Sequence, residues 1–151
     1  MGWNNDSHGL VFKPSEVKLY FDGGHTYKMK LGALSKSETT IRILTYSLPD
    51  LSYVVELFQK RPHNIYIICH EKFKDKAKQI KQEFPNIKVA SNSRIHSKLL
   101  LRSPDTIYLG SANFGVSKWH ESEVGIRSKE AHDEFLRKSF EPLWEESIEI
   151  K

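Results

Sequence analysis

Two short polar motifs carry the residue types in this chain that could do chemistry. The first is His96-x-Lys98, and the second is Gly110-Ser111-x-Asn113. A histidine can be a nucleophile or a proton carrier near neutral pH, a lysine is a fixed cation, and serine and asparagine are neutral hydrogen-bonding groups. These residue types suit the cleavage of a phosphodiester, because fixed donors can stabilise the negative charge that builds on the phosphoryl oxygens.

Two apolar runs must position these motifs. Residues 95–101 and 107–111 predict neighbouring strands, with the polar motif residues at their ends. His96 and Lys98 are two residues apart, so on a strand they project from the same face. The first run is apolar on both faces, which is typical of a central strand. The sequence therefore predicts that the pairing of these strands brings the motifs together.

Helices and strands alternate through the rest of the chain. The patterns predict strands over 16–21, 39–48, 63–69, 87–90 and 123–127, a turn at 22–24, and helices over 27–36, from 49–50 to before Pro62, over 72–84 and over 131–144. This alternation, with a hairpin-like pair near 95–111, predicts an α/β fold with a mixed β-sheet flanked by helices on both faces. We expect one domain over 1–151, with an irregular N-terminal arm over 1–14.

Composition narrows the class of partner. The 151 residues carry a formal net charge of +4, and the pI is about 9.1, which favours a polyanion such as nucleic acid or an anionic lipid surface. No apolar run is long enough for a stable membrane anchor, and residues 1–6 do not resemble a signal peptide, so we expect a cytoplasmic protein. The single cysteine, Cys69, excludes an intrachain disulfide and a cysteine-based zinc site.

The double motif resembles the signature of the phospholipase D superfamily, which is written H-x-K-x4-D-x6-G-S-x-N. The spacing matches, since six residues separate position 103 from Gly110. The opening strand, the Tyr46-Ser47 end of the second predicted strand and an acidic residue after the second motif also resemble this family. The resemblance covers most of the chain and implies the phospholipase-D-like fold.

The chain departs from the signature at two places. Ser103 stands where the signature has aspartate, and Asp105 lies two residues later, where it could take over that position. In the family this aspartate supports the site and does not perform the chemistry, so the change weakens the catalytic interpretation without cancelling it. The milder departure is Glu121, which stands two residues before Glu123, where the family often has asparagine.

The resemblance implies a mechanism that needs no metal or cofactor. His96 would attack phosphorus and form a covalent phosphohistidine. Lys98, Asn113 and Ser111 would hold the non-bridging oxygens as charge develops. Glu123 would accept the other ring N–H of His96 and fix its tautomer. The chain also lacks a clustered set of acidic residues of the kind that binds Mg²⁺.

This mechanism requires a second histidine as general acid and base, but the chain holds one motif. The small single-motif members of the family, such as the short bacterial endonucleases, form homodimers with one shared site at the interface. We therefore expect a homodimer with twofold symmetry in which His96 of each chain faces its mate.

Five further residues are candidates for binding substrate: His25, Arg94, Arg102, Trp119 and His120. Each has an ordinary alternative. His25 and His120 could be loop residues without a special role, and the two arginines could be solvated charges instead of contacts to a nucleic-acid backbone. Trp119 could stack on a base or pack against the protein.

Together these features predict a metal-independent phosphodiesterase, a nuclease that cleaves DNA. A basic pI, small size and a single motif favour this function over its alternatives. The first alternative is a phospholipid hydrolase of the cardiolipin type, which should carry an apolar membrane-docking segment. The second is a non-catalytic nucleic-acid-binding module, as Ser103 suggests. The chain could also be the catalytic domain of a larger modular nuclease.

Overall fold

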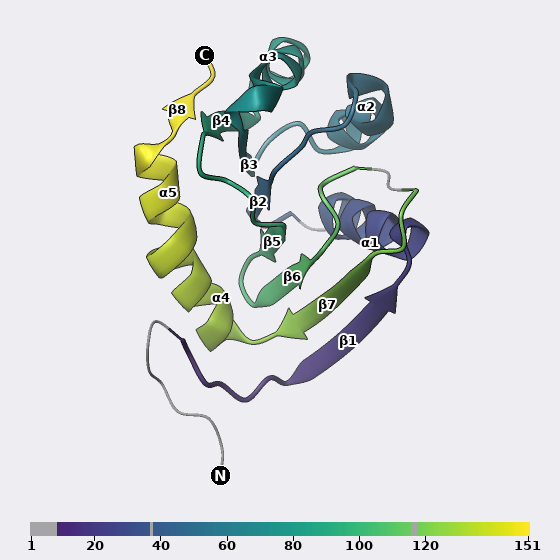
Figure 1. Cartoon of the computed structure of the whole chain (residues 1–151), viewed down its shortest axis with the longest axis vertical. Helices are drawn as coiled ribbons and strands as arrows, with labels where there is room; N and C mark the ends of the chain where they lie inside the picture. The colour runs from purple at the N-terminus through teal and green to yellow at the C-terminus, as the bar shows by residue number, and fades with distance from the viewer. Residues whose placement is uncertain (1–8, 37, 116–117) are drawn as a thin grey trace.

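The computed structural model describes residues 9–36, 38–115 and 118–151, without the side chains of residues 23–27 and 36. Its strands are β1 (Glu16–Phe21), β2 (Ile41–Thr45), β3 (Ile65–His70), β4 (Lys88–Asn92), β5 (Leu99–Arg102), β6 (Thr106–Gly110), β7 (Ser122–Arg127) and β8 (Ile148–Glu149). In these described residues the eight strands form one sheet in the order β1-β7-β6-β5-β2-β3-β4-β8 (Figure 1).

The sheet is mixed, as the sequence predicts. Strands β2, β3 and β4 are parallel, and they are connected through α2 (Leu51–Lys60) and α3 (Lys74–Glu83). Strands β5, β6, β7 and β1 add antiparallel pairs, and β5 joins this half to β2. Strand β5 therefore lies in the middle of the sheet, and its position explains why its apolar run faces a core on both sides.

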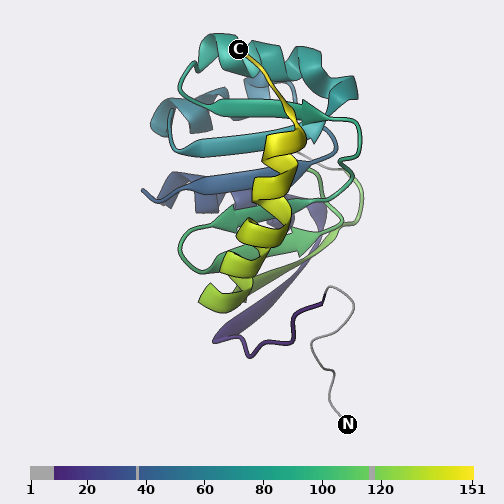
Figure 2. The same ribbon diagram turned by 90° about the vertical axis from the view of Figure 1, so that its left-hand side faces the viewer.

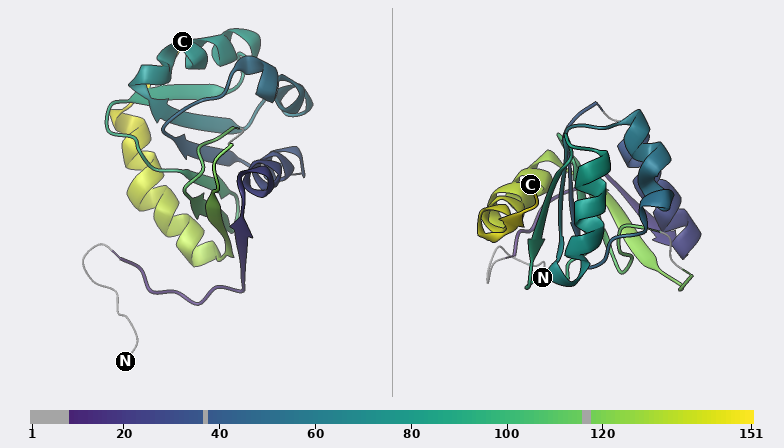
Figure 3. Two further views of the ribbon diagram at one scale, coloured as in Figure 1. Left: turned by 45° about the vertical axis from the view of Figure 1, so that its right-hand side comes forward. Right: turned by 90° about the horizontal axis from the view of Figure 1, so that it is seen from above.

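Helices cover both faces of the sheet. Helix α1 (Gly23–Lys36), α2 and α3 lie on one face, while α4 (Lys129–Phe135), a π-helical turn (Leu136–Phe140) and α5 (Glu141–Glu146) run continuously across the other (Figures 1 and 2). The right-hand view of Figure 3 shows the same three layers from above. Consecutive residues of β3 supply both cores, since Ile67 packs in the cluster under α1–α3 and Ile68 in the cluster under α4–α5.

Several predicted boundaries were wrong. Helix α1 begins at Gly23, where the sequence predicts a turn, because glycine's low helix propensity hides a helix start. Strand β5 begins at Leu99, so His96 and Lys98 lie in the β4–β5 loop and not on the strand. Strand β8 was not predicted, and its two residues pair with the edge of β4. Of the predicted arm, residues 1–8 lie outside the described residues, while 9–14 form neither helix nor strand.

No helix in the described part of the chain has the length and apolarity needed to cross a membrane.

Candidate active site

The two motifs meet at one edge of the sheet. His96 and Lys98 immediately precede β5, and Asn113 follows β6. Because β5 and β6 are antiparallel, with Leu99 opposite Leu109, the start of one strand lies beside the end of the other. The backbone N–H of Gly110 also donates to the carbonyl of Lys98 at 3.3 Å. Strand pairing thus brings together the residues that the sequence separates by more than a dozen positions.

Hydrogen bonds to the end of β2 fix the orientation of the Asn113 amide. Its Oδ1 accepts from the backbone N–H of Tyr46 at 3.0 Å and of Ser47 at 3.3 Å. Only the oxygen of an amide can accept these bonds, so the network determines which way the group faces. The Nδ2 group is left to donate its hydrogens elsewhere. Asn113 therefore offers a donor at this edge, which is the role that phosphoryl-oxygen stabilisation requires.

Thr45 holds the next residue of the same loop. Its buried Oγ1 accepts from the N–H of Phe114 at 2.9 Å and donates to the carbonyl of Ser47 at 2.8 Å. The end of β2 and the loop after β6 are therefore bonded to each other through residues 45–47 on one side and through Asn113 and Phe114 on the other. Because of these bonds, the position of Asn113 is fixed by the end of β2 as well as by its own loop.

A buried lysine that the sequence analysis missed supports the loop from below. Lys30 of α1 donates from Nζ to the carbonyl of Ala112 at 2.6 Å and lies 3.2 Å from Oε1 of Glu123. The side chains of Lys30 and Glu123 are 4% and 0% exposed. One signal could have found Lys30: it precedes Ala33 and Leu34 by three and four residues, so it falls on the buried face of a predicted helix.

Burial works against both charges of this pair. It lowers the pKa of Lys30, and the nearby Glu123 carboxylate opposes that change. It also raises the pKa of Glu123, opposed by the Lys30 ammonium. Neither carboxylate oxygen accepts a hydrogen bond of regular geometry from the described residues. Within one chain Glu123 thus contacts Lys30, and not the His96 ring that the sequence analysis assigned to it.

His96 is exposed and lies at the edge of an aromatic cluster. Its ring centroid is 5.3 Å from that of Tyr46, which in turn lies 4.9 Å from the ring of His70. His70, the last residue of β3, therefore also lies at this edge. Lys98 lies in the same loop and donates from Nζ to the carbonyl of His96 at 3.0 Å. An exposed imidazole beside a lysine can be reached by a phosphate from solvent.

Ser111 connects the loop after β6 to the segment before β7. Its hydroxyl donates to Oε2 of Glu121 at 2.8 Å and accepts from the N–H of Ser122 at 3.0 Å. Within the chain its interactions therefore hold the loop in place. Among the residues that the structure describes, no three histidine, cysteine, aspartate or glutamate side chains converge in the way a metal ion would require.

A family model for the phospholipase-D-like domain of cardiolipin synthase matches residues 31–144. The chain belongs to the phospholipase D superfamily. This is a superfamily of phosphodiesterases, and the match covers both motifs and the strands β2, β5, β6 and β7. No curated protein sequence matches the chain at a significant level.

Solved structures share the fold at low sequence identity. Nuc, a phospholipase D family member from Salmonella typhimurium, is 21% identical with a TM-score of 0.75, covering 92% of this chain and 99% of its own. NucT from Helicobacter pylori is 15% identical with a TM-score of 0.71, covering 89% and 100%. The archaeal chromatin protein TrmBL2, whose structure shows a novel mode of DNA binding, is 9% identical with a TM-score of 0.67, covering 89% and 53%.

Ser103, the departure from the superfamily signature, lies at the far end of β5 from His96. Its Oγ accepts from Nη1 of Arg42 at 3.2 Å and lies 3.4 Å from Nε2 of the buried His132. Asp105 does not take over this position, because its carboxylate accepts from the neighbouring Thr106 hydroxyl at 2.9 Å. Ser103 itself thus makes the contacts at this position, at the end of β5 that lies away from His96.

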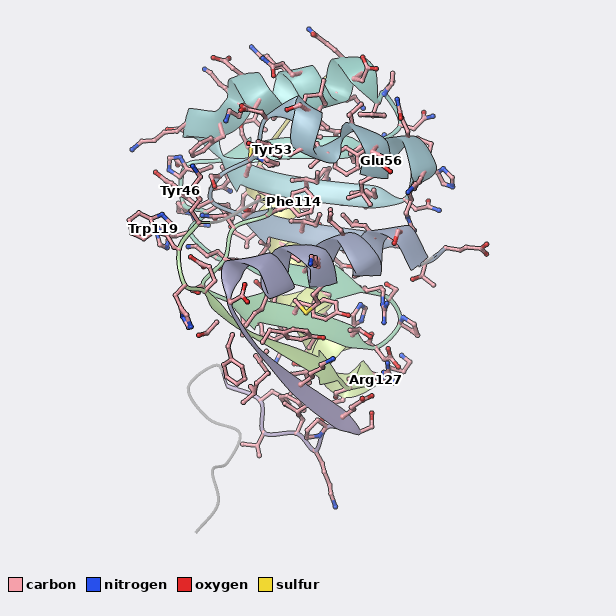
Figure 4. All side chains as sticks on the ribbon, turned by 90° about the vertical axis from the view of Figure 1, so that its right-hand side faces the viewer. Tyr46, Tyr53, Glu56, Phe114, Trp119 and Arg127 are labelled. Atoms are coloured by element: carbon pink, nitrogen blue, oxygen red, sulfur yellow. The ribbon has the colours of Figure 1, made fainter. Side chains whose placement is uncertain are left out.

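The five further candidates divide by position. Arg94 forms an ion pair with Glu146 of α5. Arg102 is the last residue of β5, so it lies at the end of the strand opposite the motifs. It pairs with Thr106, which in turn pairs with Arg127. Figure 4 shows Arg127 on one side of the molecule and Tyr46 and Trp119 on the other. Trp119 lines a cavity next to Asn113. His120 is exposed in the segment before β7, and the side chain of His25 lies outside the described residues.

Proposed function

We propose that this chain is a metal-independent phosphodiesterase that cleaves nucleic acid, with DNA as its substrate. The supporting observation is the meeting of an exposed His96, the Lys98 ammonium and an Asn113 amide whose orientation makes it a donor. A net charge of +4 favours a polyanionic substrate. The DNA binding reported for TrmBL2, on the same fold, agrees with such a substrate.

In the proposed reaction, His96 attacks phosphorus and forms an N–P bond while the bond from phosphorus to the leaving oxygen breaks. The leaving oxygen takes a proton from a general acid. Water then attacks the phosphohistidine, the same group removes its proton, and His96 is released. Lys98 and Asn113 stabilise the charge on the non-bridging oxygens in both steps. No step of this reaction uses a metal ion, so the reaction should proceed in EDTA.

We propose that the general acid comes from a second copy of the chain. The proposed site uses His96 as the nucleophile, and the mechanism needs a further imidazole facing it. A homodimer with twofold symmetry supplies His96 of the partner, so that two half-sites form one complete site. The exposure of His96 at the edge of the sheet leaves it accessible to such a partner.

A nuclease assay in EDTA tests the catalytic proposal. Wild-type protein should cleave an oligodeoxynucleotide without added metal, and His96→Ala should abolish cleavage. His63→Ala is the matched control, because His63 is exposed and lies in the loop before β3, away from the motifs. Cleavage that requires Mg²⁺, or that survives His96→Ala, would rule out the mechanism. Binding without cleavage would instead identify a non-catalytic nucleic-acid-binding module.

Subunit mixing tests the shared site. If one His96 attacks and the other protonates, a mixed dimer of wild-type and His96→Ala chains is inactive. Equal amounts that exchange freely should retain about a quarter of the wild-type activity, whereas independent sites would retain about half. Sedimentation at micromolar concentration should show a dimer, and an active monomer would contradict the proposal.

One observation favours the phospholipid alternative. Val17, Leu19 and Phe21 alternate along the edge strand β1, so they project from the same face, and they are 50%, 59% and 63% exposed. Such an apolar strip could enter a membrane surface. A parallel assay with cardiolipin vesicles decides: hydrolysis of lipid but not DNA, reduced by Leu19→Asp, would replace the nuclease proposal.

A further inference from the structure

A cavity of about 460 Å³ lies directly beside Asn113. Leu48 and Pro49, from the loop after β2, line one part of it, while Phe114 and Trp119 come from the segment between β6 and β7. The volume is within the range of pockets that hold small organic groups. Because Asn113 also lines the cavity, a group bound there would lie next to any phosphate held at the proposed active site.

The backbone at Gly115 shapes this cavity. Gly115 has a φ of +139°, a conformation that residues with side chains rarely adopt, and an added Cβ would lie 3.0 Å from Cβ of Pro49. Two separate constraints therefore require glycine where the chain turns against Pro49. This close approach joins the two loops that form the cavity.

The lining combines an aromatic surface with the cation of Lys118 and the carboxylate of Glu121, which accepts a hydrogen bond from the Ser111 hydroxyl. Trp119 is 80% exposed, the largest exposed fraction among the exposed large apolar residues of the described chain. Lys118 is exposed beside it and also lines the cavity. Aromatic rings on which bases stack, next to cations that contact the backbone, are what proteins use to bind single-stranded nucleic acid. A lipid headgroup offers no flat ring to match the indole.

We propose that this cavity binds one unpaired nucleobase next to the scissile phosphate, with the base against Trp119 and a flanking phosphate near Lys118. The proposal rests on the proposed function, since that function places the phosphate at Asn113. A base within a duplex is stacked and paired, so it cannot enter the cavity without being extruded. The substrate class is therefore single-stranded or frayed nucleic acid.

Binding tests this site separately from catalysis. Each variant is made in the 151-residue chain that also carries His96→Ala, so that a labelled oligothymidylate stays intact. Affinity is measured in EDTA by fluorescence anisotropy. Trp119→Ala should weaken binding by about 10- to 100-fold, and Trp119→Phe should retain most of the affinity. Lys118→Ala should weaken binding and reduce its salt dependence, while Lys60→Ala on α2 serves as the matched control. A duplex of the same length should compete poorly.

Three results would overturn the site: unchanged affinity in Trp119→Ala, equal binding of the duplex, or effective competition by cardiolipin vesicles. Circular dichroism of each variant shows whether it has folded. If the oligonucleotide binds as expected but wild-type protein does not cleave it, the catalytic proposal fails and the base-binding site stands. If cleavage of single strands does not depend on Trp119, the site fails and the catalytic proposal stands.

Discussion

Lys30 and Glu123 form an ion pair inside the protein, with Nζ 3.2 Å from Oε1 and both side chains shielded from water. The pair connects α1 to β7, and the same ammonium holds the carbonyl of Ala112 two residues after Gly110. A charge pair in such surroundings has little net value compared with an apolar pair, but removing one partner leaves the other charge buried alone. The position of the loop that carries Asn113 thus depends on a buried ion pair.

Lys30→Met should destabilise the protein by about 3–5 kcal/mol, because Glu123 would be left buried without its cation. Urea unfolding measures the change. Lys60→Met is the control, since the Lys60–Glu56 pair is 64% and 83% exposed and its loss should cost at most about 1 kcal/mol. The double variant Lys30→Met/Glu123→Leu should recover much of the lost stability. Equal losses of stability from the two lysine substitutions would contradict a buried ion pair between Lys30 and Glu123.

Asn113→Asp should leave the fold intact and lower cleavage by about 10²- to 10³-fold. The remaining oxygen can still accept from Tyr46 and Ser47, so little stability should be lost. The Nδ2 donor is replaced by an oxygen that repels a phosphate. Asn86→Asp, at an exposed position between α3 and β4, controls for the added charge. Normal cleavage by Asn113→Asp would show that the amide donates nothing to the reaction.

Ser103→Asp should stabilise the protein with little effect on catalysis. The new carboxylate would face the Arg42 guanidinium, which now donates to the serine hydroxyl. A charge-assisted hydrogen bond is stronger than a neutral one, and we expect a gain of about 1 kcal/mol. Thermal unfolding and the cleavage assay measure the two effects. A large increase in cleavage would show instead that Ser103 limits the chemistry from the far end of β5.

The buried thiol of Cys69 gives a pH dependence with a defined sign. Burial raises the pKa of Cys69 from 9.0 to about 12. Between these values the unfolded chain loses a proton that the folded chain keeps, so the free energy of unfolding falls as pH rises through this range. Cys69→Ala should lack that part of the slope. Iodoacetamide should modify Cys69 only after unfolding in urea, and rapid alkylation of the folded protein at pH 8 would contradict its burial.

Periodicity predicted where most strands and helices lie, although an alternating pattern did not show which apolar faces are buried. Strand β1 has the predicted bounds, and the apolar run that contains Leu99 and Leu100 is central because both of its faces meet a core. Boundaries at glycine and at polar motif residues were missed, since a pattern cannot show where backbone hydrogen bonding stops. Gly23 begins a helix and His96 lies outside a strand for this reason.

The motifs name candidate site residues but do not show what holds these residues in place. The residues around Lys30 do not predict its contacts with Ala112 and Glu123, because these lie 82 and 93 positions away in the sequence. The family resemblance implied that Glu123 contacts His96, whereas within the chain the buried Glu123 pairs with Lys30. Long-range polar partners depend on the packing of α1 against the sheet, which periodicity does not resolve.

The bonds between Asn113 and residues 46 and 47 have a dynamic consequence, because they span 67 and 66 positions of sequence. The amide is oriented only while the end of β2 and the loop after β6 are both in place. A transient opening of this edge would free the Asn113 amide to rotate. The molecule would then lack the proposed activity while the rest of its sheet stayed folded. The hydrogen-exchange rate of the Tyr46 amide would then measure the fraction of molecules in which this edge is open.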